Sequence, residues 1–312
     1  MKALVTGGAG FIGSNLVDAL LARGDAVTVI DNLSTGRREN LDGALAAGAK
    51  LAELDIREAA ALAELVAETR PEVVFHLAAQ IDVRKSIEDP AFDAAINVGG
   101  TANLLEAARA AGSPRIVFVS TGGAIYGEGE GQQLPLDEST PIAPLSAYGQ
   151  SKFAAEGYLA LYERLYGLSG MSLRLGNVYG PRQDPLGEAG VIAIFCGRLR
   201  AGERPTVFGD GKQTRDYIYV GDVVAAALAA AASELCGPIN IGSGIETDVL
   251  ELARLLGEIG GVDDFEPELA PPRAGEVQRI ALDASLAERE LGWRGTTSVA
   301  DGLRLTLESI SG

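Results

Sequence analysis

The chain is poor in the side chains that build metal centres and hydrolytic triads. Its 312 residues include one histidine, His76, and two cysteines, Cys196 and Cys236. A triad or a metal centre that needs several histidines is therefore excluded. The spacing of the two cysteines fits neither a metal site nor a redox pair. We therefore expect them to be small core residues of a cytoplasmic protein. We expect His76, at the end of an apolar run, to be packed rather than catalytic.

Basic residues are scarce relative to acidic ones. The chain has 26 Lys and Arg against 43 Asp and Glu, a net charge of −17. This balance argues against nucleic acid and anionic membranes as partners. Long apolar runs are missing from the N-terminus, so we expect neither export nor membrane insertion. The length suggests about two domains.

Glycine is abundant, with 40 residues, and its placement near the N-terminus is informative. Residues 2–6 are typical of a short buried strand, and they run into Gly7-Gly8-Ala9-Gly10-Phe11-Ile12-Gly13, which opens an apolar helix. Glycines at 7, 10 and 13 permit a tight turn, the approach of a pyrophosphate and close packing of helix on strand. The helix N-terminus then attracts phosphate. The pattern predicts a dinucleotide site.

An acid at the end of the second expected strand favours NAD over NADP. Asp31 follows Gly13 by the distance expected for a carboxylate that binds both adenosine ribose hydroxyls, and it would repel a 2′-phosphate. Arg37 and Arg38 leave the alternative open, since two arginines could bind that phosphate. We interpret them as solvated loop residues.

The remaining pattern alternates strands and helices. Strands are expected near 2–6, 26–30, 49–54, 72–76, 115–119 and 171–175, and helices near 12–23, 58–69, 91–111 and 147–166. This alternation predicts an α/β fold, a doubly wound parallel sheet (Rossmann) with ligands at the carboxyl ends of the strands. We expect residues 1–175 to form this domain, joined by segments from about 210–245. Residues 176–312 mainly form a smaller lobe for substrate, with short helices near 189–201, 221–234, 248–259 and 298–310.

Tyr148 and Lys152 stand one turn apart if residues 147–166 are helical, so they share a face. An unperturbed tyrosine has a pKa of about 10. One positive charge at about 4 Å supplies on the order of 4 kcal/mol, so one lysine, helped by an oxidised nicotinamide, is enough to bring that pKa near 7. The spacing therefore predicts a catalytic base, with the hydroxyls of Ser120 and Thr121 nearby at the end of a strand.

These motifs together resemble one enzyme family over almost the whole chain. The stretches that carry the resemblance are Thr6–Gly13, Asp31-Asn32, Asp55-Ile56-Arg57, His76-Leu-Ala-Ala79, Asn97-Val-Gly-Gly-Thr101, Tyr148-x-x-x-Lys152 and Arg174-Leu-Gly-Asn-Val-Tyr-Gly-Pro-Arg182. They look like the extended short-chain dehydrogenase/reductases, and within them the NAD-dependent sugar-nucleotide epimerases of the UDP-glucose 4-epimerase type.

The resemblance implies a mechanism and a set of cofactor contacts. Tyr148 takes the proton of the sugar 4-hydroxyl while NAD takes the hydride, and the 4-keto sugar turns before both return. Lys152 lowers the pKa of Tyr148 and also binds the nicotinamide ribose. The other residues implied for NAD are Gly7, Gly10, Phe11, Ile12, Gly13, Asp31, Asn32, Asp55, Ile56, Leu77, Ala78, Ala79 and Asn97.

The resemblance also implies a UDP-sugar substrate and a homodimer. Arginine suits a diphosphate because its planar fork donates two hydrogen bonds. Val207 and Phe208 either form an apolar wall beside the uracil or belong to the hydrophobic core. The expected substrate contacts are Ser120, Thr121, Tyr148, Asn177, Val191, Val207, Arg215 and Arg273.

The chain departs from the family at one position, and several substrates and activities stay open. Relatives carry a Ser or Thr where this chain has Gly122, and we favour Thr121 as its replacement, with Ser120 or water as the other candidates. Gly122 and Gly123 lack the acid–base groups of the related dehydratases. Arg84 is a possible partner for a carboxylate, so a uronic-acid substrate stays open. N-acetylhexosamines also stay open, because the sequence does not give the width of the pocket. Net reduction of a ketosugar and an NAD-binding regulator without turnover are also compatible with the sequence.

Overall fold

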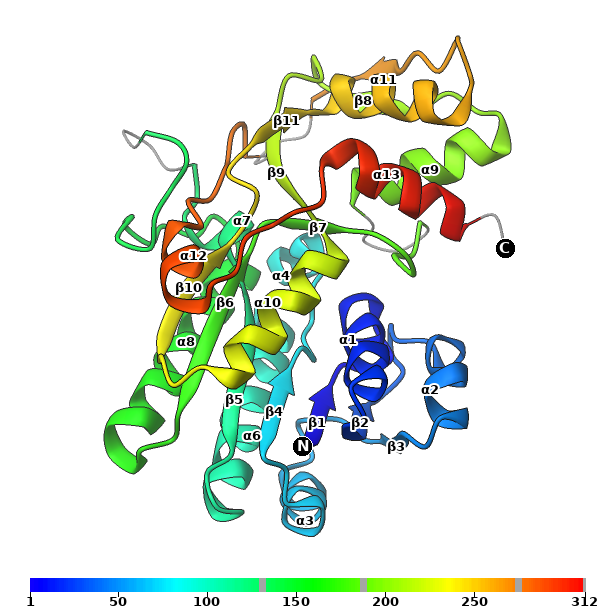
Figure 1. Cartoon of the computed structure of the whole chain (residues 1–312). Coiled ribbons are helices and arrows are strands. Elements are labelled where there is room, and N and C mark those ends of the chain that lie inside the picture. The colour runs from blue at the N-terminus through cyan, green and yellow to red at the C-terminus, as the bar shows by residue number, and fades with distance from the viewer. Residues whose placement is uncertain (129–132, 186–189, 273–276, 311–312) are drawn as a thin grey trace.

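The computed structural model describes residues 1–128, 133–185, 190–272 and 277–310. In these ranges seven parallel strands form the main sheet, in the order β10-β6-β5-β4-β1-β2-β3 (Figure 1). Their bounds are β1 Lys2–Thr6, β2 Ala26–Asp31, β3 Lys50–Glu53, β4 Val73–His76, β5 Arg115–Thr121, β6 Gly170–Leu175 and β10 Gly237–Ile241. The predicted doubly wound parallel sheet is confirmed.

Alternating apolar residues divide the strands between two cores, one on each face of the sheet. On β4, Val73 and Phe75 belong to one cluster and Val74 to the other. On β5, Val117 lies on the first side and Ile116 and Phe118 on the second. Because side chains alternate along a strand, runs that are apolar throughout bury both faces.

Helices cover both faces. The first face carries α1 (Phe11–Ala22) and α10 (Val220–Ala232), with α12 (Ser285–Leu291) beside β10. The second carries α3 (Ala59–Thr69), α6 (Thr101–Ala110) and α8 (Ala147–Tyr166), which pack in that order (Figure 1). The short η1 (Arg38–Leu41) and α2 (Asp42–Ala46) follow β2.

The helix expected over 91–111 is confirmed as one helical run over residues 90–110, which contains a π turn that the sequence does not reveal. The segment after β4 contains α4 (Val83–Glu88), α5 (Pro90–Ala94), a π-helical turn η2 (Ala95–Gly100) and then α6. Asp89 caps α5 by accepting from the Phe92 N–H at 3.0 Å, and proline occupies the first turn of α5. The π turn inserts an extra residue into the helix, as is frequent at functional sites.

The strand order reverses between β1 and β4. Ligands of such sheets bind outside the carboxyl ends of the strands at this reversal. The glycine-rich segment follows β1, residue 77 follows β4, and the short α7 (Gly122–Ile125) follows β5. The late strand β10 pairs with β6 and completes the sheet.

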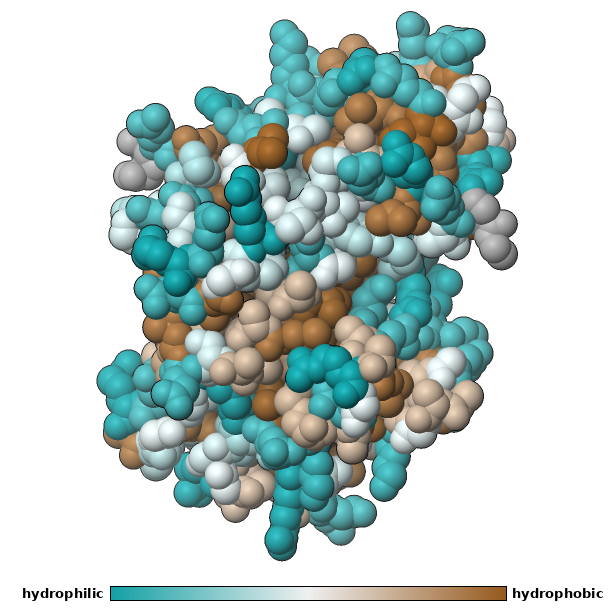
Figure 2. Space-filling view, viewed as in Figure 1, coloured by the Kyte–Doolittle hydropathy of each residue, from teal (hydrophilic) through white to brown (hydrophobic). Residues whose placement is uncertain are grey.

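A smaller lobe stands over this edge. It contains β7 (Asn177–Tyr179), β9 (Thr214–Tyr219) and β11 (Glu246–Asp248) in one sheet, and β8 (Thr206–Phe208) with β12 (Glu268–Ala270) in another. Its helices are α9 (Val191–Ala201), α11 (Val249–Gly260) and α13 (Val299–Ser309), around a core of their own. Figure 2 shows an apolar band across the middle of the viewed face, over α10. None of the helices in the described ranges has the length and apolar character that a membrane crossing needs.

Candidate functional site

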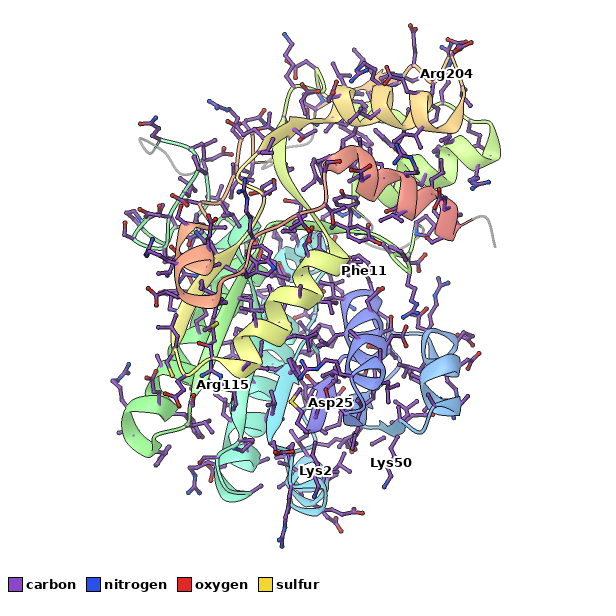
Figure 3. The ribbon with its side chains drawn as sticks, in the orientation of Figure 1. Lys2, Phe11, Asp25, Lys50, Arg115 and Arg204 are labelled. Atoms are coloured by element: carbon purple, nitrogen blue, oxygen red, sulfur yellow. The ribbon has the colours of Figure 1, made fainter. Side chains whose placement is uncertain are left out.

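The loop between β1 and α1 packs so closely that two of its glycines leave no room for a side chain. Gly7 has a φ of +71°, and a Cβ there would lie 2.6 Å from the Ala78 nitrogen. A Cβ on Gly13 would lie 2.1 Å from the Gly7 oxygen. Phe11 begins α1 at the end that faces the smaller lobe (Figure 3). The loop thus forms a bare backbone cradle at a helix N-terminus, which fits a pyrophosphate.

Asp31 lies beside this cradle. It is buried, and its carboxylate accepts the Ala9 and Leu33 N–H groups, both at 2.9 Å. Burial raises the pKa of Asp31, while the two backbone hydrogen bonds act against that rise. A carboxylate held at the end of β2 fits the ribose of an adenosine.

The two arginines that left NADP open have acidic partners. Arg37 forms an ion pair with Asp184 at 2.5 Å, and Arg38 with Glu53 at 3.1 Å. On the same edge, Asn32 donates to Asp55 at 2.8 Å. Hydrogen bonds from Arg57 hold the pKa of Asp55 well below its usual range. This end of the crevice therefore carries carboxylates rather than unpartnered cations.

The segment after β4 is tied to the cradle and to the π turn. Ala78 donates its N–H to the Thr6 hydroxyl at 3.2 Å. Further along, Gln80 donates its N–H to the Asn97 side chain at 2.8 Å, and Asn97 returns a hydrogen bond to the Gln80 carbonyl at 2.9 Å. Asn97 therefore holds this segment through its amide, and its direct contact with NAD stays a prediction.

The remaining predicted cofactor residues lie on the same edge. Ile56 is buried and packs where a Cβ on Gly100 would meet it at 2.5 Å. Leu77 follows β4 and donates its N–H to the Thr6 carbonyl at 3.1 Å. The contacts predicted for Gly10, Ile12 and Ala79 stay predictions.

His76 is locked in one tautomer below the crevice. Thr101 donates its hydroxyl to the Asn97 carbonyl at 2.6 Å, so it accepts from His76 Nε2 at 2.9 Å. His76 Nδ1 is then the acceptor for the Thr6 hydroxyl at 2.7 Å. Burial lowers the pKa of His76 to about 3, and the Lys152 charge adds to this. The packed, neutral histidine is as expected.

Tyr148 and Lys152 lie on one face of α8, as the spacing predicts. The Lys152 ammonium is 6.0 Å from the centre of the Tyr148 ring and donates to the Val119 carbonyl at 2.8 Å. Lys152 is 3% exposed, and burial lowers its pKa to about 8.

Burial has the largest effect on the pKa of Tyr148 within the protein. Burial raises the pKa of Tyr148 to about 12, the charge of Asp93 acts in the same direction, and a hydrogen bond from Thr121 opposes both. Desolvation of the phenolate is therefore the largest effect on this pKa within the protein itself. The pKa near 7 expected from Lys152 together with an oxidised nicotinamide stays a prediction.

Thr121 is the hydroxyl residue that meets Tyr148. It ends β5, and its hydroxyl lies near the Tyr148 phenol and lowers the pKa of Tyr148. A Cβ on Gly122 would instead lie 2.4 Å from Leu282 Cδ1, so position 122 faces a small apolar cluster. This geometry explains why the hydroxyl stands at 121 and not at 122.

The substrate role expected for Ser120 is contradicted. Its hydroxyl donates to Glu156 at 2.6 Å, and the residue is 2% exposed. Glu156 forms a buried ion pair with Arg174 at 2.7 Å. Arg174 in turn donates to the Tyr126 hydroxyl at 2.9 Å. Ser120 therefore belongs to a buried network that fixes α8 to β5 and β6.

The other predicted substrate residues lie in the smaller lobe or outside the described residues. Asn177 lines a cavity of about 250 Å³ whose far wall includes Ile192 at the start of α9, next to Val191. Arg215 is half-buried on β9 and donates to the Thr214 carbonyl at 2.8 Å. Val207 is buried in the core of the smaller lobe, which favours core packing for its side chain, and its substrate contact stays a prediction. Arg273 lies outside the described residues.

Sequence reasoning missed the residues that support the site from behind. Asp93 is the main example, because it is fully buried and acts on both Tyr148 and Lys152. Its spacing of four residues from Asn97 was a signal, since residues at that spacing share a helix face. Glu156 offered the same signal, four residues after Lys152.

Comparison with known proteins agrees with this geometry. A model of the NAD dependent epimerase/dehydratase family matches residues 3–242. A UDP-glucose 4-epimerase of Mycolicibacterium smegmatis is 47% identical over 311 residues, which cover 99% of this chain and 98% of that protein.

Two solved structures are similar over the full length. The UDP-glucose 4-epimerase of Thermotoga maritima with UDP-glucose has a TM-score of 0.96 and 46% identity, covering 100% of this chain and 99% of the other. The UDP-glucose 4-epimerase of Thermus thermophilus in complex with NAD has a TM-score of 0.92 and 45% identity, with the same coverage.

Proposed function

Since the chain belongs to the NAD-dependent epimerase/dehydratase family, we propose that it is a UDP-glucose 4-epimerase that interconverts UDP-glucose and UDP-galactose. The observation that carries the proposal is that Tyr148 and the buried Lys152 share one face of α8 next to Thr121 at the end of β5, in a fold shared over its full length with enzymes of that name.

The residues of the first domain fit NAD. The backbone cradle at Gly7 and Gly13 suits the pyrophosphate, and Asp31 suits the adenosine ribose. When bound, oxidised NAD supplies a hydride acceptor and a positive charge. We propose that residues 1–175 hold NAD and that residues 176–312 mainly hold the nucleotide sugar.

Tyr148 is proposed to move the proton of the sugar 4-hydroxyl. The phenolate accepts this proton as the C4–H bond breaks, and the phenol returns it to the 4-keto oxygen when the C4–H bond re-forms on the other face. Thr121 holds the phenol oxygen through its hydrogen bond. With a pKa of about 8, Lys152 is mainly protonated at pH 7, so its ammonium favours the phenolate.

The smaller lobe offers donors for the rest of the substrate. Asn177 lines the cavity between β7 and α9, and Arg215 on the neighbouring β9 carries a guanidinium suited to a diphosphate. Arg273 is proposed as a second such donor from its sequence position alone.

A single assay tests the proposal. Purified protein with UDP-galactose should form UDP-glucose without accumulating NADH. Steady NADH release would instead indicate a dehydrogenase, and no product from UDP-glucose, UDP-N-acetylhexosamine or UDP-glucuronate would indicate a regulator. Replacing Tyr148 with Phe should reduce conversion by about 10²–10⁴-fold while bound NAD is retained. A fully active Y148F enzyme would contradict the assigned role.

We further propose that the protein forms a homodimer. Tyr158, Leu161 and Leu165 are 40%, 36% and 61% exposed, and their spacing puts them on one face of α8. A second copy of this chain is the proposed cover. Leu165→Glu should halve the mass measured by light scattering, whereas Leu269→Glu, a similarly exposed position in the other lobe, should not. A single-chain mass for the unaltered protein would end the dimer proposal.

We also propose a cytoplasmic location. Cys196 and Cys236 form no disulfide, which suits a reducing compartment. Cell fractionation with detection of the protein in the soluble cytoplasmic fraction is the test.

A further inference from the structure

Asp93 is a buried carboxylate that the proposed mechanism does not use. It lies on α5 and has no exposed surface. The helix packs against α4, the π turn η2 and α8, which carries Tyr148 and Lys152. A fully buried acid at this place needs a physical reason, because burying a charge is costly unless other groups compensate it.

One oxygen of Asp93 orients two amide side chains. Its Oδ1 accepts from Gln80 Nε2 at 2.9 Å and from Asn97 Nδ2 at 3.1 Å. An ionised carboxylate only accepts hydrogen bonds, so it fixes which end of each amide points inward. The reciprocal bonds between Gln80 and Asn97 depend on that orientation. Asp93 therefore holds the segment after β4 against the π turn.

The other oxygen has no such use. Among the described residues, Asp93 Oδ2 is buried without a hydrogen-bond partner. Compensation must then come from charge at longer range. The Asp93 charge raises the pKa of Lys152, against the effect of burial, and raises the pKa of Tyr148.

Other charges around α5 do not replace this interaction. The charged residues of α4, Arg84, Lys85 and Glu88, are exposed, and η2 has no titratable residue. On α8, the charge of Glu156 also raises the pKa of Lys152, but less than that of Asp93 does, and Glu156 itself forms an ion pair with Arg174. His76 on β4 is neutral because burial lowers its pKa to about 3. Lys152 on α8 is thus a buried cation on which the Asp93 charge acts.

We propose that Asp93 is a positioning residue that acts through its neighbours: it orients the Gln80–Asn97 pair and serves as the buried counter-charge of the Lys152 ammonium. The consequence for catalysis rests on the proposed epimerase function. An epimerase must take a proton and return it through the same group. The negative charge of Asp93 opposes that of Lys152 at Tyr148, so the phenolate stays a strong enough base to take the proton.

The first test removes the charge and keeps the shape. In Asp93→Asn the amide oxygen still accepts from Gln80 and Asn97. In the NAD-loaded enzyme, the acidic limb of the pH profile of kcat should move to lower pH by about one unit. Glu88→Gln, an exposed acid on α4, is the control and should leave the profile unchanged. A D93N profile that superimposes on the unaltered enzyme at both limbs would overturn the proposal.

The second test needs no turnover, so it separates this proposal from the proposed function. If Asp93 compensates Lys152, D93N should lower the thermal midpoint by several degrees in the unaltered protein and by much less in a Lys152→Met background. Recovery of a folded D93N/K152M protein where D93N alone does not fold would support the same conclusion. An equal loss in both backgrounds would show a purely structural role and overturn the counter-charge.

Discussion

At the scale of the residue, the hydroxyl beside Tyr148 is decided by the packing of its neighbours. Thr121 and Gly122 are adjacent, yet Thr121 reaches Tyr148 while position 122 faces Leu282. The family resemblance places the hydroxyl at position 122 and gives no reason for its shift to position 121. Only the contact with Leu282, far away in the chain, explains it.

Exchanging the hydroxyl between these two positions is therefore a sharp test. Thr121→Val should lower kcat by about 10²-fold because one donor to a reacting oxygen is lost, and Thr121→Ser should keep most of the activity. Gly122→Ser combined with T121V should not restore it. The added side chain at 122 should instead cost about 1–3 kcal/mol of stability through overpacking against Leu282. Steady-state kinetics and thermal unfolding measure both, and rescue by the serine at 122 would contradict the assignment.

The single histidine gives a clean prediction on pH. The folded-state pKa of His76 is about 3, against an ordinary value of 6.5, because burial disfavours the cation. Its proton NMR signal should not move between pH 8 and 5, where an accessible histidine titrates.

The sign of the effect on stability follows from the same shift. Below pH 6.5 the unfolded chain binds a proton that the folded chain does not, so His76 destabilises the fold progressively as the pH falls from 6.5 toward 3. Replacing His76 with Asn should flatten this part of the stability curve measured by denaturant titration. An NMR midpoint near 6.5 would show that the residue is accessible.

At the scale of the element, the parts that sequence predicts well are those with a strong period. The pattern predicts the first six strands of the main sheet, α1, α3 and α8 to within one or two residues of their bounds. It does not resolve the helix over 91–111 into its parts, because a π turn keeps the apolar pattern of a helix and changes only its register. The cause of that turn is tertiary: Asn97 bonds Gln80, and Ile56 fills the space at Gly100.

The strands of the smaller lobe could not be expected from pattern. β7, β8, β11 and β12 have three residues each, which is too short for a period of two to be recognised. Their pairing depends on residues far away in the chain, as when β8 pairs with β12. For the same reason, the sequence alone does not show whether Val207 lines a ligand site or belongs to the core.

The N-terminal turn of α1 is tightly constrained by its backbone contacts. Gly13→Ala puts a methyl group at 2.1 Å from the Gly7 oxygen, so the turn must open and NAD should be lost. Gly43→Ala in α2 is the matched control, because nothing lies within 4 Å of that Cβ. The control should retain NAD and gain about 0.5–1 kcal/mol of stability. NAD content after denaturation, measured by absorbance, distinguishes the two, and a G13A protein with full NAD content would contradict the cradle.

At the scale of the whole molecule, the site is formed by convergence of distant segments. The loop after β1, the end of β2, the segment after β4 and the end of β5 meet because parallel strands bring their carboxyl ends to one edge. This convergence was predictable from the alternation of strands and helices. How the smaller lobe is attached to that edge was not, because the attachment uses exposed side chains with no pattern.

The segment after β7 is tied to the first domain at three points. Asn15 donates to the Pro181 carbonyl at 3.1 Å, Arg182 forms an ion pair with Asp18, and Arg37 forms one with Asp184. Two of these partners lie on α1, directly after the glycine cradle. Arg37 also donates its N–H to the Ala9 carbonyl within the cradle. The ties therefore connect the smaller lobe to the backbone expected to hold NAD.

Loosening one tie should speed the release of NAD without unfolding the protein. Asp184→Asn removes the pair with Arg37, which is exposed enough to contribute at most about 1 kcal/mol, so release should accelerate by no more than about fivefold. High salt should have the same effect on the unaltered protein and little further effect on D184N, because screening weakens exposed pairs. Glu258→Gln breaks a comparable exposed pair on α11 and should leave release unchanged. Exchange of bound NAD against labelled NAD measures the rate, and equal rates for D184N and the unaltered protein at low salt would show that this tie does not retain the cofactor.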